Sequence, residues 1–293
     1  MIKQTLYFTL PCSLSMKNSQ MIISIKESEQ KITRAIEDIG FIVIENQLVS
    51  ITIPLLNELV QNNVSVIFCD NKMMPKSMLM NLDGNQIQGE NYREQINISE
   101  PTKKQIWKQI VEYKIKNQSL LLDKIGKSGN CLKPYYNNVK SGDTDNREGL
   151  AAHVYWKKLL GKDFIRDRNG QSPNNLLNYG YSLLRAATAR ALVGSGLSPA
   201  FGIFHRNRYN SYPLADDIME PYRPFVDEMV FNIFTNGESE LNKESKSNLL
   251  RLLFCDVHLN KLTRPLEVAL TLTTASLIKC FKGERKSIVY PLL

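Results

Sequence analysis

The chain of 293 residues contains few cysteines and histidines and no long apolar run. Its five cysteines lie far apart and form no CxxC pair, which favours reduced thiols over disulfides or a zinc ribbon. The apolar run at the N-terminus is interrupted by Pro11, and no stretch approaches the ~18 apolar residues of a membrane span. We therefore expect a soluble protein of the cytoplasm.

The motifs of several enzyme classes are also absent. The segment "KIGKSGN" contains GKS, but the first glycine of a P-loop would fall on Leu121. The segment "GSGLSPAFG" lacks the third glycine of a dinucleotide-binding turn, and it follows an expected helix instead of a strand. Neither GxSxG nor HExxH occurs, and no serine stands in the elbow of a hydrolase.

Positive charge is concentrated after residue 85. The formal net charge of the chain is +8. Residues 1–85 contain seven Lys and Arg and eight Asp and Glu, whereas residues 86–293 contain 30 and 21, so the net charges are −1 and +9. A basic region of this size is expected if it binds a polyanion such as nucleic acid, although a basic surface can also simply aid solubility.

The pattern of apolar residues changes near the same place. The first part carries short β-branched runs separated by polar turns, with one short helix that has Pro54 at its first position. From about Glu90 the segments are longer and show helical periodicity, and one helix is expected to start with Ser172 as N-cap and to stop at Gly194. We predict an α+β protein: a β-strand domain at 1–85, a linker near 82–90, and a larger all-helical domain at 86–293.

One glutamate falls on an apolar helix face. If the segment "DTDNREGLAAHVYWKKLLG" is helical, Glu148 shares a stripe with Ala152, Tyr155 and Leu159, so its carboxylate would face inward. A buried acid needs a cation, a metal or a proton. Alternatively, Glu148 forms an ion pair with an arginine in the core, or it lies in the first helical turn and interacts favourably with the helix dipole.

The stretch "GIFHRNRYNSYPLADDIMEPYRP" at 202–224 gathers one of the three histidines, His205, with three acids and three arginines. In a helix that starts at Pro213, Asp217 and Glu220 share a face, and Pro221 should distort the helix directly after Glu220. Like charges at this spacing repel unless a cation lies between them. The ordinary alternative is that the acids lie in a solvent-exposed turn and that His205 is a core or surface residue and not a metal ligand.

Together these residues predict a Mg²⁺ or Mn²⁺ site, because carboxylates suit hard divalent ions and an imidazole shifts the preference towards Mn²⁺. Arg206, Arg208 and Arg223 would then offer bidentate contacts to a phosphodiester. A metal in such a site polarises the phosphoryl oxygen and lowers the pKa of an attacking hydroxyl, so that no covalent nucleophile is required.

The sequence resembles the CRISPR-associated protein one family, the integrase of spacer acquisition, and its spelling is closest to the branch found in type II systems. The likeness spans essentially the whole chain. It rests on "NREGLAA" at 146–152, "NNLLNYGYSLLRA" at 174–186, "GLSPAFGIFH" at 196–205 and "LADDIMEPYRPFVD" at 214–227. The N-terminal "FIVIENQLVSITIPLLNELVQNNVSVIFCD" at 41–70 also fits.

The resemblance implies a catalytic, metal-binding set. The Glu of the "REG" motif is Glu148, the His that closes "GIFH" is His205, and the acid that ends "DIME" is Glu220, at a position where other branches carry Asp. Asp217 matches another acidic position of the family and would support the metal directly or through water. Asp216 has no such match.

The resemblance also implies an activity and its partners. The protein would be a metal-dependent endonuclease and integrase that inserts short foreign DNA as new spacers, by attack of 3′-hydroxyls on the phosphodiesters at the ends of a CRISPR repeat. Its partners would be double-stranded DNA, a second copy forming a homodimer, and a small ferredoxin-like protein that completes a heterohexamer. Type II relatives also work with the effector nuclease and, in one subtype, with a ring-shaped DNA-binding accessory protein.

In this scheme residues 1–85 serve dimerisation and partner binding, and residues 86–293 serve catalysis and DNA binding. Lys103, Lys104, Lys108 and the segment 279–286 are candidate phosphate contacts, or plain solvated faces. Two other functions remain open from the residues alone: a non-catalytic basic DNA-binding scaffold whose acids are structural, and a hydrolase of small nucleotides.

Overall fold

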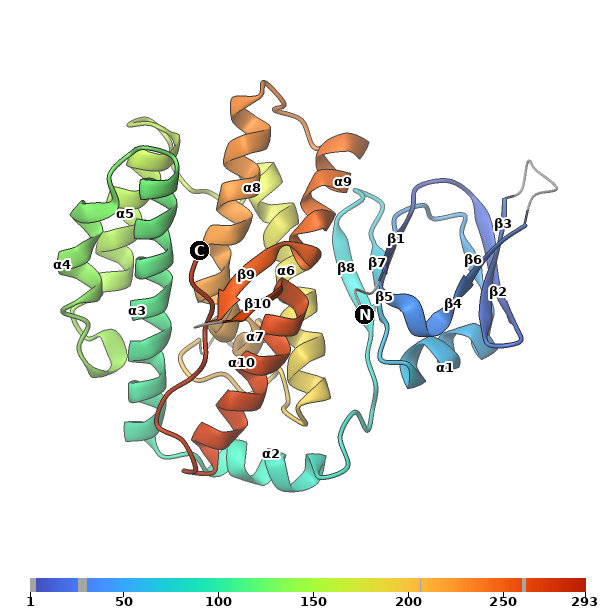
Figure 1. Cartoon of the computed structure of the whole chain (residues 1–293), viewed down its shortest axis with the longest axis horizontal. Helices are drawn as coiled ribbons and strands as arrows, with labels where there is room; N and C mark the ends of the chain where they lie inside the picture. The colour runs from blue at the N-terminus through green and yellow to red at the C-terminus, as the bar shows by residue number, and fades with distance from the viewer. Residues whose placement is uncertain (1–3, 26–30, 206, 260–261) are drawn as a thin grey trace. The chain divides into compact units, whose positions relative to one another are not determined.

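The computed structural model describes residues 4–25, 31–205, 207–259 and 262–293 (Figure 1). The chain divides into two compact units, Met1–Gly84 and Asn85–Leu293. None of the helices in the described ranges is long and apolar enough to cross a membrane.

The described part of the N-terminal unit forms two four-stranded sheets with one α-helix. The strand orders are β1-β5-β7-β8 and β4-β3-β2-β6. In the first sheet β5 runs parallel to both β1 and β7, and β8 closes the edge in the antiparallel direction. The elements are β1 (Gln4–Phe8), β2 (Cys12–Lys17), β3 (Gln20–Ile25), β4 (Lys31–Ala35), β5 (Ile39–Ile44), β6 (Ser50–Ile51), α1 (Ile53–Gln61), β7 (Ser65–Cys69) and β8 (Pro75–Leu79).

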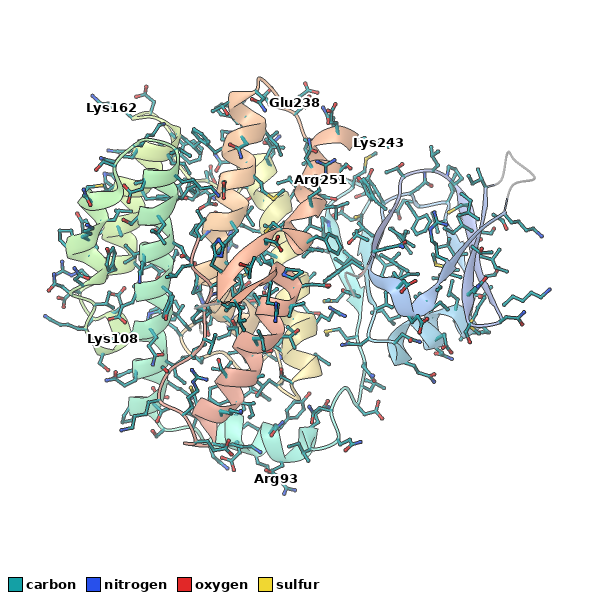
Figure 2. The ribbon with its side chains drawn as sticks, in the orientation of Figure 1. Arg93, Lys108, Lys162, Glu238, Lys243 and Arg251 are labelled. Carbon is teal, nitrogen blue, oxygen red and sulfur yellow. The ribbon has the colours of Figure 1, made fainter. Side chains whose placement is uncertain are left out.

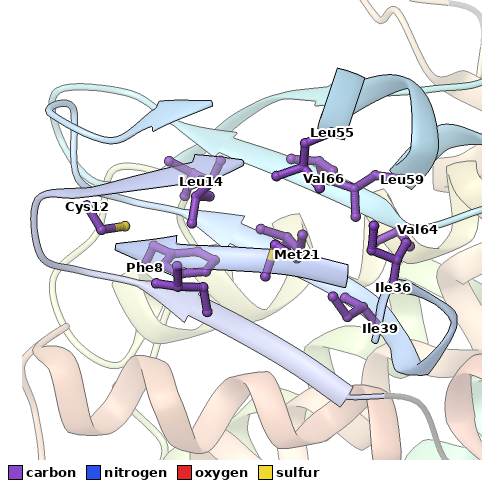
Figure 3. Packing of buried hydrophobic residues seen from close by; sticks show 13 residues of the cluster. Phe8, Cys12, Leu14, Met21, Ile36, Ile39, Leu55, Leu59, Val64 and Val66 are labelled. Atoms are coloured by element: carbon purple, nitrogen blue, oxygen red, sulfur yellow. The ribbon is translucent and has the colours of Figure 1, made fainter. Parts of the chain in front are cut away.

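The core of this unit lies between the sheets and α1. Every residue of β5 is buried, which explains why its sequence is a continuous apolar run without alternation. Leu55 and Leu59 of α1 face Val66 of β7 in the same apolar cluster (Figure 3). Pro54 lies in the first turn of α1. The apolar runs did not reveal β2, β4 and β8, because these strands mix apolar residues with small polar or basic ones.

In its described residues the C-terminal unit is helical apart from one antiparallel strand pair, which the prediction of an all-helical domain missed. The predicted α+β class is confirmed. Its helices are α2 (Gln88–Asn97), α3 (Glu100–Lys124), α4 (Lys133–Tyr136), α5 (Arg147–Leu160), α6 (Asn174–Gly194), α7 (Pro213–Met219), α8 (Arg223–Thr235), α9 (Lys243–Leu250) and α10 (Leu266–Phe281). The strand pair is β9 (Asp256–Leu259) with β10 (Leu262–Pro265).

Two long helices organise this unit. The largely buried α6 packs against α7, α8, α9 and α10, while α3 packs against α5, α7 and α8 (Figure 1). The crossing of α6 and α8 is close at Gly180, where an added Cβ would lie 2.5 Å from Val226 Cγ1. A residue without a side chain is therefore required there. The two long helices hold α5 and α7, which carry the candidate acids.

The start of α6 differs from the prediction. Ser172 is not the N-cap: the helix begins at Asn174, and the Ser172 hydroxyl is buried without a hydrogen-bond partner. The Asn174 side chain instead ties the helix start to the preceding loop, since its Oδ1 accepts from Arg166 (2.9 Å) and from the Asp167 N–H (3.0 Å). The predicted end of the helix at Gly194 is confirmed.

Candidate metal centre

Glu148 lies in the first turn of α5, whose N-terminus is held by two side chains. Asn146 is the N-cap, with a φ of 52°, and its side chain accepts a hydrogen bond from the Gly149 N–H at 3.2 Å. The buried Asp143 carboxylate accepts hydrogen bonds from the N–H groups of Arg147 (2.8 Å) and Glu148 (3.1 Å). These bonds satisfy N–H groups that a helix start leaves without partners, and they fix the direction of the first turn.

The stripe expected on α5 is present. Tyr155 and Leu159 are buried, and His153 and Lys157 on the other side are exposed. Glu148 is half-buried, with 21% of its side chain exposed, so the carboxylate lies at the edge of the core and remains reachable from solvent.

Glu220 follows α7 directly, at the point where the helix changes form. The α-helix ends at Met219 and continues as a 3₁₀ turn, η4 (Glu220–Tyr222), which confirms the distortion predicted from Pro221. The buried Asn117 side chain of α3 donates to the Pro221 carbonyl at 2.8 Å and so anchors this turn. The Glu220 side chain is 4% exposed, and Arg223 contacts its Oε1 at 3.0 Å.

The two glutamates meet at one lysine. Lys114 Nζ on α3 lies 2.6 Å from Glu148 Oε1 and 2.6 Å from Glu220 Oε2. The two carboxylate oxygens are therefore within twice that distance of each other. Burial alone lowers the pKa of Lys114, but the carboxylates of Glu148 and Glu220 outweigh it and the net pKa is raised. Burial alone raises the pKa of Glu220, but Arg223 and then Lys114 outweigh it, so its net pKa is lowered.

The loop before α7 wraps around Asp217. This fully buried carboxylate accepts backbone hydrogen bonds from Ile203 (2.6 Å), Phe204 (3.0 Å) and His205 (3.2 Å), and a fourth from His205 Nδ1 at 2.6 Å. A carboxylate accepts only, so Nδ1 carries the proton, and Nε2 is the ring nitrogen that can bind a metal. Asp217 thus acts on the imidazole and the loop and has no oxygen to spare.

Gly202 makes this wrapping possible. An added Cβ there would lie 2.8 Å from Pro213 Cβ, 2.9 Å from the His205 carbonyl and 3.2 Å from Asp217 Oδ2. A side chain at residue 202 would push the loop off the carboxylate. The glycine in "GIFH" is therefore needed for the loop that carries His205 to pack against Asp217.

The carboxylates of both glutamates act electrostatically on the imidazole of His205. Its pKa is raised, mainly by the hydrogen bond to Asp217, with smaller contributions from Glu220 and Glu148. The indole of Trp107 on α3 contacts the ring edge-on, with centroids 5.8 Å apart. The structure thus brings the two predicted carboxylates around one cation and sets the predicted histidine within electrostatic reach of both.

In the described residues no group of three His, Cys, Asp or Glu side chains is arranged to hold a metal ion as it stands. Instead, the Lys114 ammonium lies between Glu148 and Glu220. The chemistry of the donor set nevertheless fits a hard divalent ion: two carboxylates hold a cation between them, and both act electrostatically on an imidazole.

A cavity of about 490 Å³ opens beside His205. Its lining includes four arginines, and its one acid, Asp216, pairs with Arg185 at 2.9 Å. Arg223 lines the same cavity while it holds Glu220, and the Tyr209 ring, whose residue is 78% exposed, lies at the opening. Guanidinium groups and an exposed ring next to a candidate metal site are suited to a phosphodiester and its base.

The comparisons with known proteins identify the family of the chain. The family model described as CRISPR associated protein Cas1 matches residues 6–253. The chain belongs to the Cas1 family. The CRISPR-associated endonuclease Cas1 of Neisseria meningitidis serogroup C (strain 8013) is 37% identical over 252 residues, which cover 85% of this chain and 82% of that protein. Members of the Cas1 family are generally metal-dependent.

Two solved structures share the Cas1 fold with this chain at low identity. A casposase bound to integration product has a TM-score of 0.80 at 19% identity, over 98% of this chain and 92% of that chain. A Cas6-RT-Cas1–Cas2 complex has a TM-score of 0.73 at 20% identity, over 98% of this chain and 36% of that chain. At these identities the likeness concerns the fold alone.

The basic residues singled out from the sequence differ in their surroundings. Lys103 pairs with Glu100 at 3.3 Å, and Lys108, at the surface of α3 (Figure 2), pairs with Glu112 at 3.6 Å. In the segment 279–286, Lys282 pairs with Glu90 at 2.8 Å. Exposed ion pairs of this kind break readily, so these pairs leave the phosphate contacts predicted for the lysines open.

The arginines differ as well. Arg206 lies outside the described residues. Arg208 is exposed, packs on the ring of Tyr209, and lines a second cavity of about 520 Å³ that also contains Lys103 and His205. Arg223 is committed to Glu220.

Two largely buried charged residues, Lys114 and Asp227, were not predicted from the sequence. Lys114 lies four residues after Ile110 and three after Val111, on the buried face of α3, and a lysine in a buried stripe was the available signal. Asp227 of α8 is buried and accepts hydrogen bonds from the hydroxyls of Tyr155 (2.7 Å) and Tyr181. Together these three side chains form a second buried polar cluster.

Proposed function

We infer that this protein of the Cas1 family is the metal-dependent endonuclease and integrase of CRISPR adaptation. It inserts short foreign DNA fragments as new spacers into a CRISPR array, by attack of 3′-hydroxyls on the phosphodiesters at the ends of the repeat. The family match over residues 6–253 and the 37% identity to the Neisseria endonuclease support this function.

For the metal we propose Glu148, His205 and Glu220 as ligands and as the catalytic residues. The observation that carries this assignment is the shared cation position: one ammonium contacts both glutamates at 2.6 Å. Both glutamates also act electrostatically on the His205 imidazole, whose Nδ1 is occupied by Asp217. When bound, a Mg²⁺ or Mn²⁺ ion would polarise the phosphoryl oxygen and lower the pKa of the attacking hydroxyl.

The chain's own residues prepare this chemistry. Arg223 fixes Glu220 from one side, and Asp217 fixes the orientation of the His205 ring. Asp143 directs the first turn of α5, which carries Glu148. Held in this way, the ligands need little rearrangement during the reaction, which is the main way in which proteins accelerate phosphoryl transfer.

We propose that the cavity beside His205 receives the DNA backbone next to the reacting phosphodiester. Arg166, Arg168 and Arg185 line it and would neutralise phosphate charge, while Tyr209 would stack on a base. The net charge of +9 on residues 86–293 supports double-stranded DNA as the ligand of the helical unit.

The N-terminal unit, predicted as residues 1–85, is proposed to bind protein. It is nearly neutral, and it exposes a set of large apolar side chains: Leu10, Leu48, Ile53, Met73 and Leu82. We propose that this unit forms the homodimer and contacts the small ferredoxin-like second protein of the adaptation module, giving a heterohexamer. The similar Cas6-RT-Cas1–Cas2 complex supports such a partner.

We further propose that the protein belongs to the type II branch of the family and works with the effector nuclease and the ring-shaped accessory protein of such systems. Glu220 supports this assignment, because other branches carry Asp at that position. A cytoplasmic location is proposed from the five cysteines, which lie far apart in the sequence and form no CxxC pair.

The proposed function is tested by half-site integration into a supercoiled plasmid that carries a repeat, with the purified protein and its small partner. Strand transfer is expected with Mn²⁺ and not with a chelator. Glu148→Gln should abolish transfer and retain DNA binding. The matched control is Glu228→Gln, since Glu228 is also 21% exposed and also pairs with a lysine, Lys124, at 2.6 Å. Unchanged integration by folded Glu148→Gln would rule out the proposed role.

A further inference from the structure

The ammonium of Lys114 lies where a metal ion shared by Glu148 and Glu220 would bind. It contacts Glu148 Oε1 and Glu220 Oε2, each at 2.6 Å. The remaining Glu220 oxygen, Oε1, is engaged by Arg223 at 3.0 Å. A metal that bridges the two carboxylates therefore competes for Glu220 Oε2, which Lys114 now contacts.

The local charges disfavour simultaneous binding of the Lys114 ammonium and a divalent metal ion between the two glutamates. Lys114 and Arg223 already balance the charges of Glu148 and Glu220, and a divalent ion adds two further positive charges. The Lys114 side chain is 13% exposed and that of Glu220 is 4% exposed, so water screens their interactions poorly. Repulsion between a metal ion and an ammonium in such surroundings is strong.

The position of Lys114 on α3 fixes the ammonium at this point. Three residues later on the same helix, Asn117 donates to the carbonyls of Pro221 (2.8 Å) and Pro291 (3.1 Å). The same stretch of α3 thus anchors the turn that carries Glu220 and supplies the cation that pairs with it. Buried neighbours on both sides, Ile110 and Ile115, limit the movement of the backbone.

We propose that Lys114 is the internal counter-ion of the metal centre: it holds Glu148 and Glu220 together in the metal-free protein, and the metal must displace it to bind. Lys114 is thus a positioning residue, which preserves the carboxylate pair at the expense of metal affinity. The inference rests on the metal ligands proposed above.

Calorimetric titration of the full-length protein with Mn²⁺, without DNA, tests the competition. Lys114→Met should bind Mn²⁺ about tenfold or more tightly than the wild type, because no cation has to leave. In chelator its Tm should be lower than that of the wild type, and Mn²⁺ should raise the Tm of the variant by more. The control is Lys124→Met, which removes the ion pair with Glu228 at 2.6 Å and should leave Mn²⁺ affinity unchanged. Equal or weaker affinity of folded Lys114→Met overturns the proposal.

A second measurement uses the wild type and does not depend on a variant that folds. Lys114 should be protected from an amine-reactive reagent in chelator and become modified when Mn²⁺ is added, as read by mass spectrometry of the labelled peptide. The same labelling in both conditions overturns the proposal.

The titration also distinguishes failure of the proposed metal ligands from failure of the proposed role of Lys114. If Glu148→Gln has the same Mn²⁺ isotherm as the wild type, the proposed ligands and this inference fail together. If Glu148→Gln loses Mn²⁺ binding while Lys114→Met binds like the wild type, the inference alone fails.

Discussion

The Asp217 carboxylate accepts two hydrogen bonds from His205, one from Nδ1 at 2.6 Å and one from the backbone N–H at 3.2 Å. It also accepts the N–H groups of Ile203 and Phe204 at 2.6 and 3.0 Å. Asp217 lies three residues before Glu220, so one short helix positions both the imidazole and a glutamate of the candidate centre.

Asp217→Asn should disturb the ring without removing it. The NH₂ of the asparagine amide cannot accept a hydrogen bond, so at least one N–H group that now donates to Asp217 would lose its acceptor. A buried N–H group without an acceptor is costly. Since partners that orient a metal-binding histidine typically contribute 10- to 100-fold, we expect integration to fall by about that factor. Half-site integration and Mn²⁺ calorimetry measure the loss. Wild-type values for both, in a variant with unchanged circular dichroism, would contradict the positioning role.

The sequence was sufficient for the parts of the fold that depend on local chemistry. Continuous β-branched runs predicted β5 and β7, and Pro221 predicted the irregularity after Glu220, because proline acts within its own turn. Periodicity also predicted the buried face of α5. The N-cap at Ser172 was wrong, since Asn174 takes its hydrogen bonds from a loop whose position the local sequence does not encode.

The organisation of the centre depends on contacts between distant segments. Lys114 and Glu148 are separated by 34 residues, and Lys114 and Glu220 by still more, so no spacing rule links them. The sequence motifs shared with the family predicted Glu148, His205 and Glu220 as metal ligands. They carried no signal that a lysine lies between the two glutamates, or that Asp217 is occupied by the loop and the ring.

Asp227 should make the stability of the helical unit depend on pH. Burial raises the pKa of this carboxyl to about 6, against the hydrogen bonds from Tyr181 and Tyr155, which act in the opposite direction. The folded protein therefore holds the proton more tightly than the unfolded chain. The resulting stabilisation is fully present below the unfolded pKa of about 3.9, and it is lost as the pH rises through about 6.

Asp227→Asn removes this titration. Between pH 5 and pH 7 the wild type should lose on the order of 1 kcal/mol more of its free energy of unfolding than the variant does. Denaturant unfolding of both proteins at the two pH values measures the difference. Equal losses would show that Asp227 does not titrate in this range.

Gly180 should not tolerate a methyl group. Gly180→Ala would place a Cβ 2.5 Å from Val226 Cγ1, and we expect a loss of about 1–3 kcal/mol in the free energy of unfolding. The matched control is Gly89→Ala in α2, where nothing lies within 4 Å of the added Cβ. There alanine should stabilise the helix by up to about 1 kcal/mol. Thermal or denaturant unfolding measures both, and a stable Gly180→Ala variant would contradict the close crossing of α6 and α8.

The central claim is that Glu148, His205 and Glu220 bind one divalent cation. Crystals of the full-length protein grown with Mn²⁺, measured at the manganese absorption edge, locate that ion directly. The account predicts one anomalous peak within ligand distance, about 2.0–2.3 Å, of a carboxylate oxygen of each glutamate and of His205 Nε2, with Lys114 moved away. A peak bound elsewhere, or a site in which Lys114 still bridges Glu148 and Glu220 at saturating Mn²⁺, would contradict it.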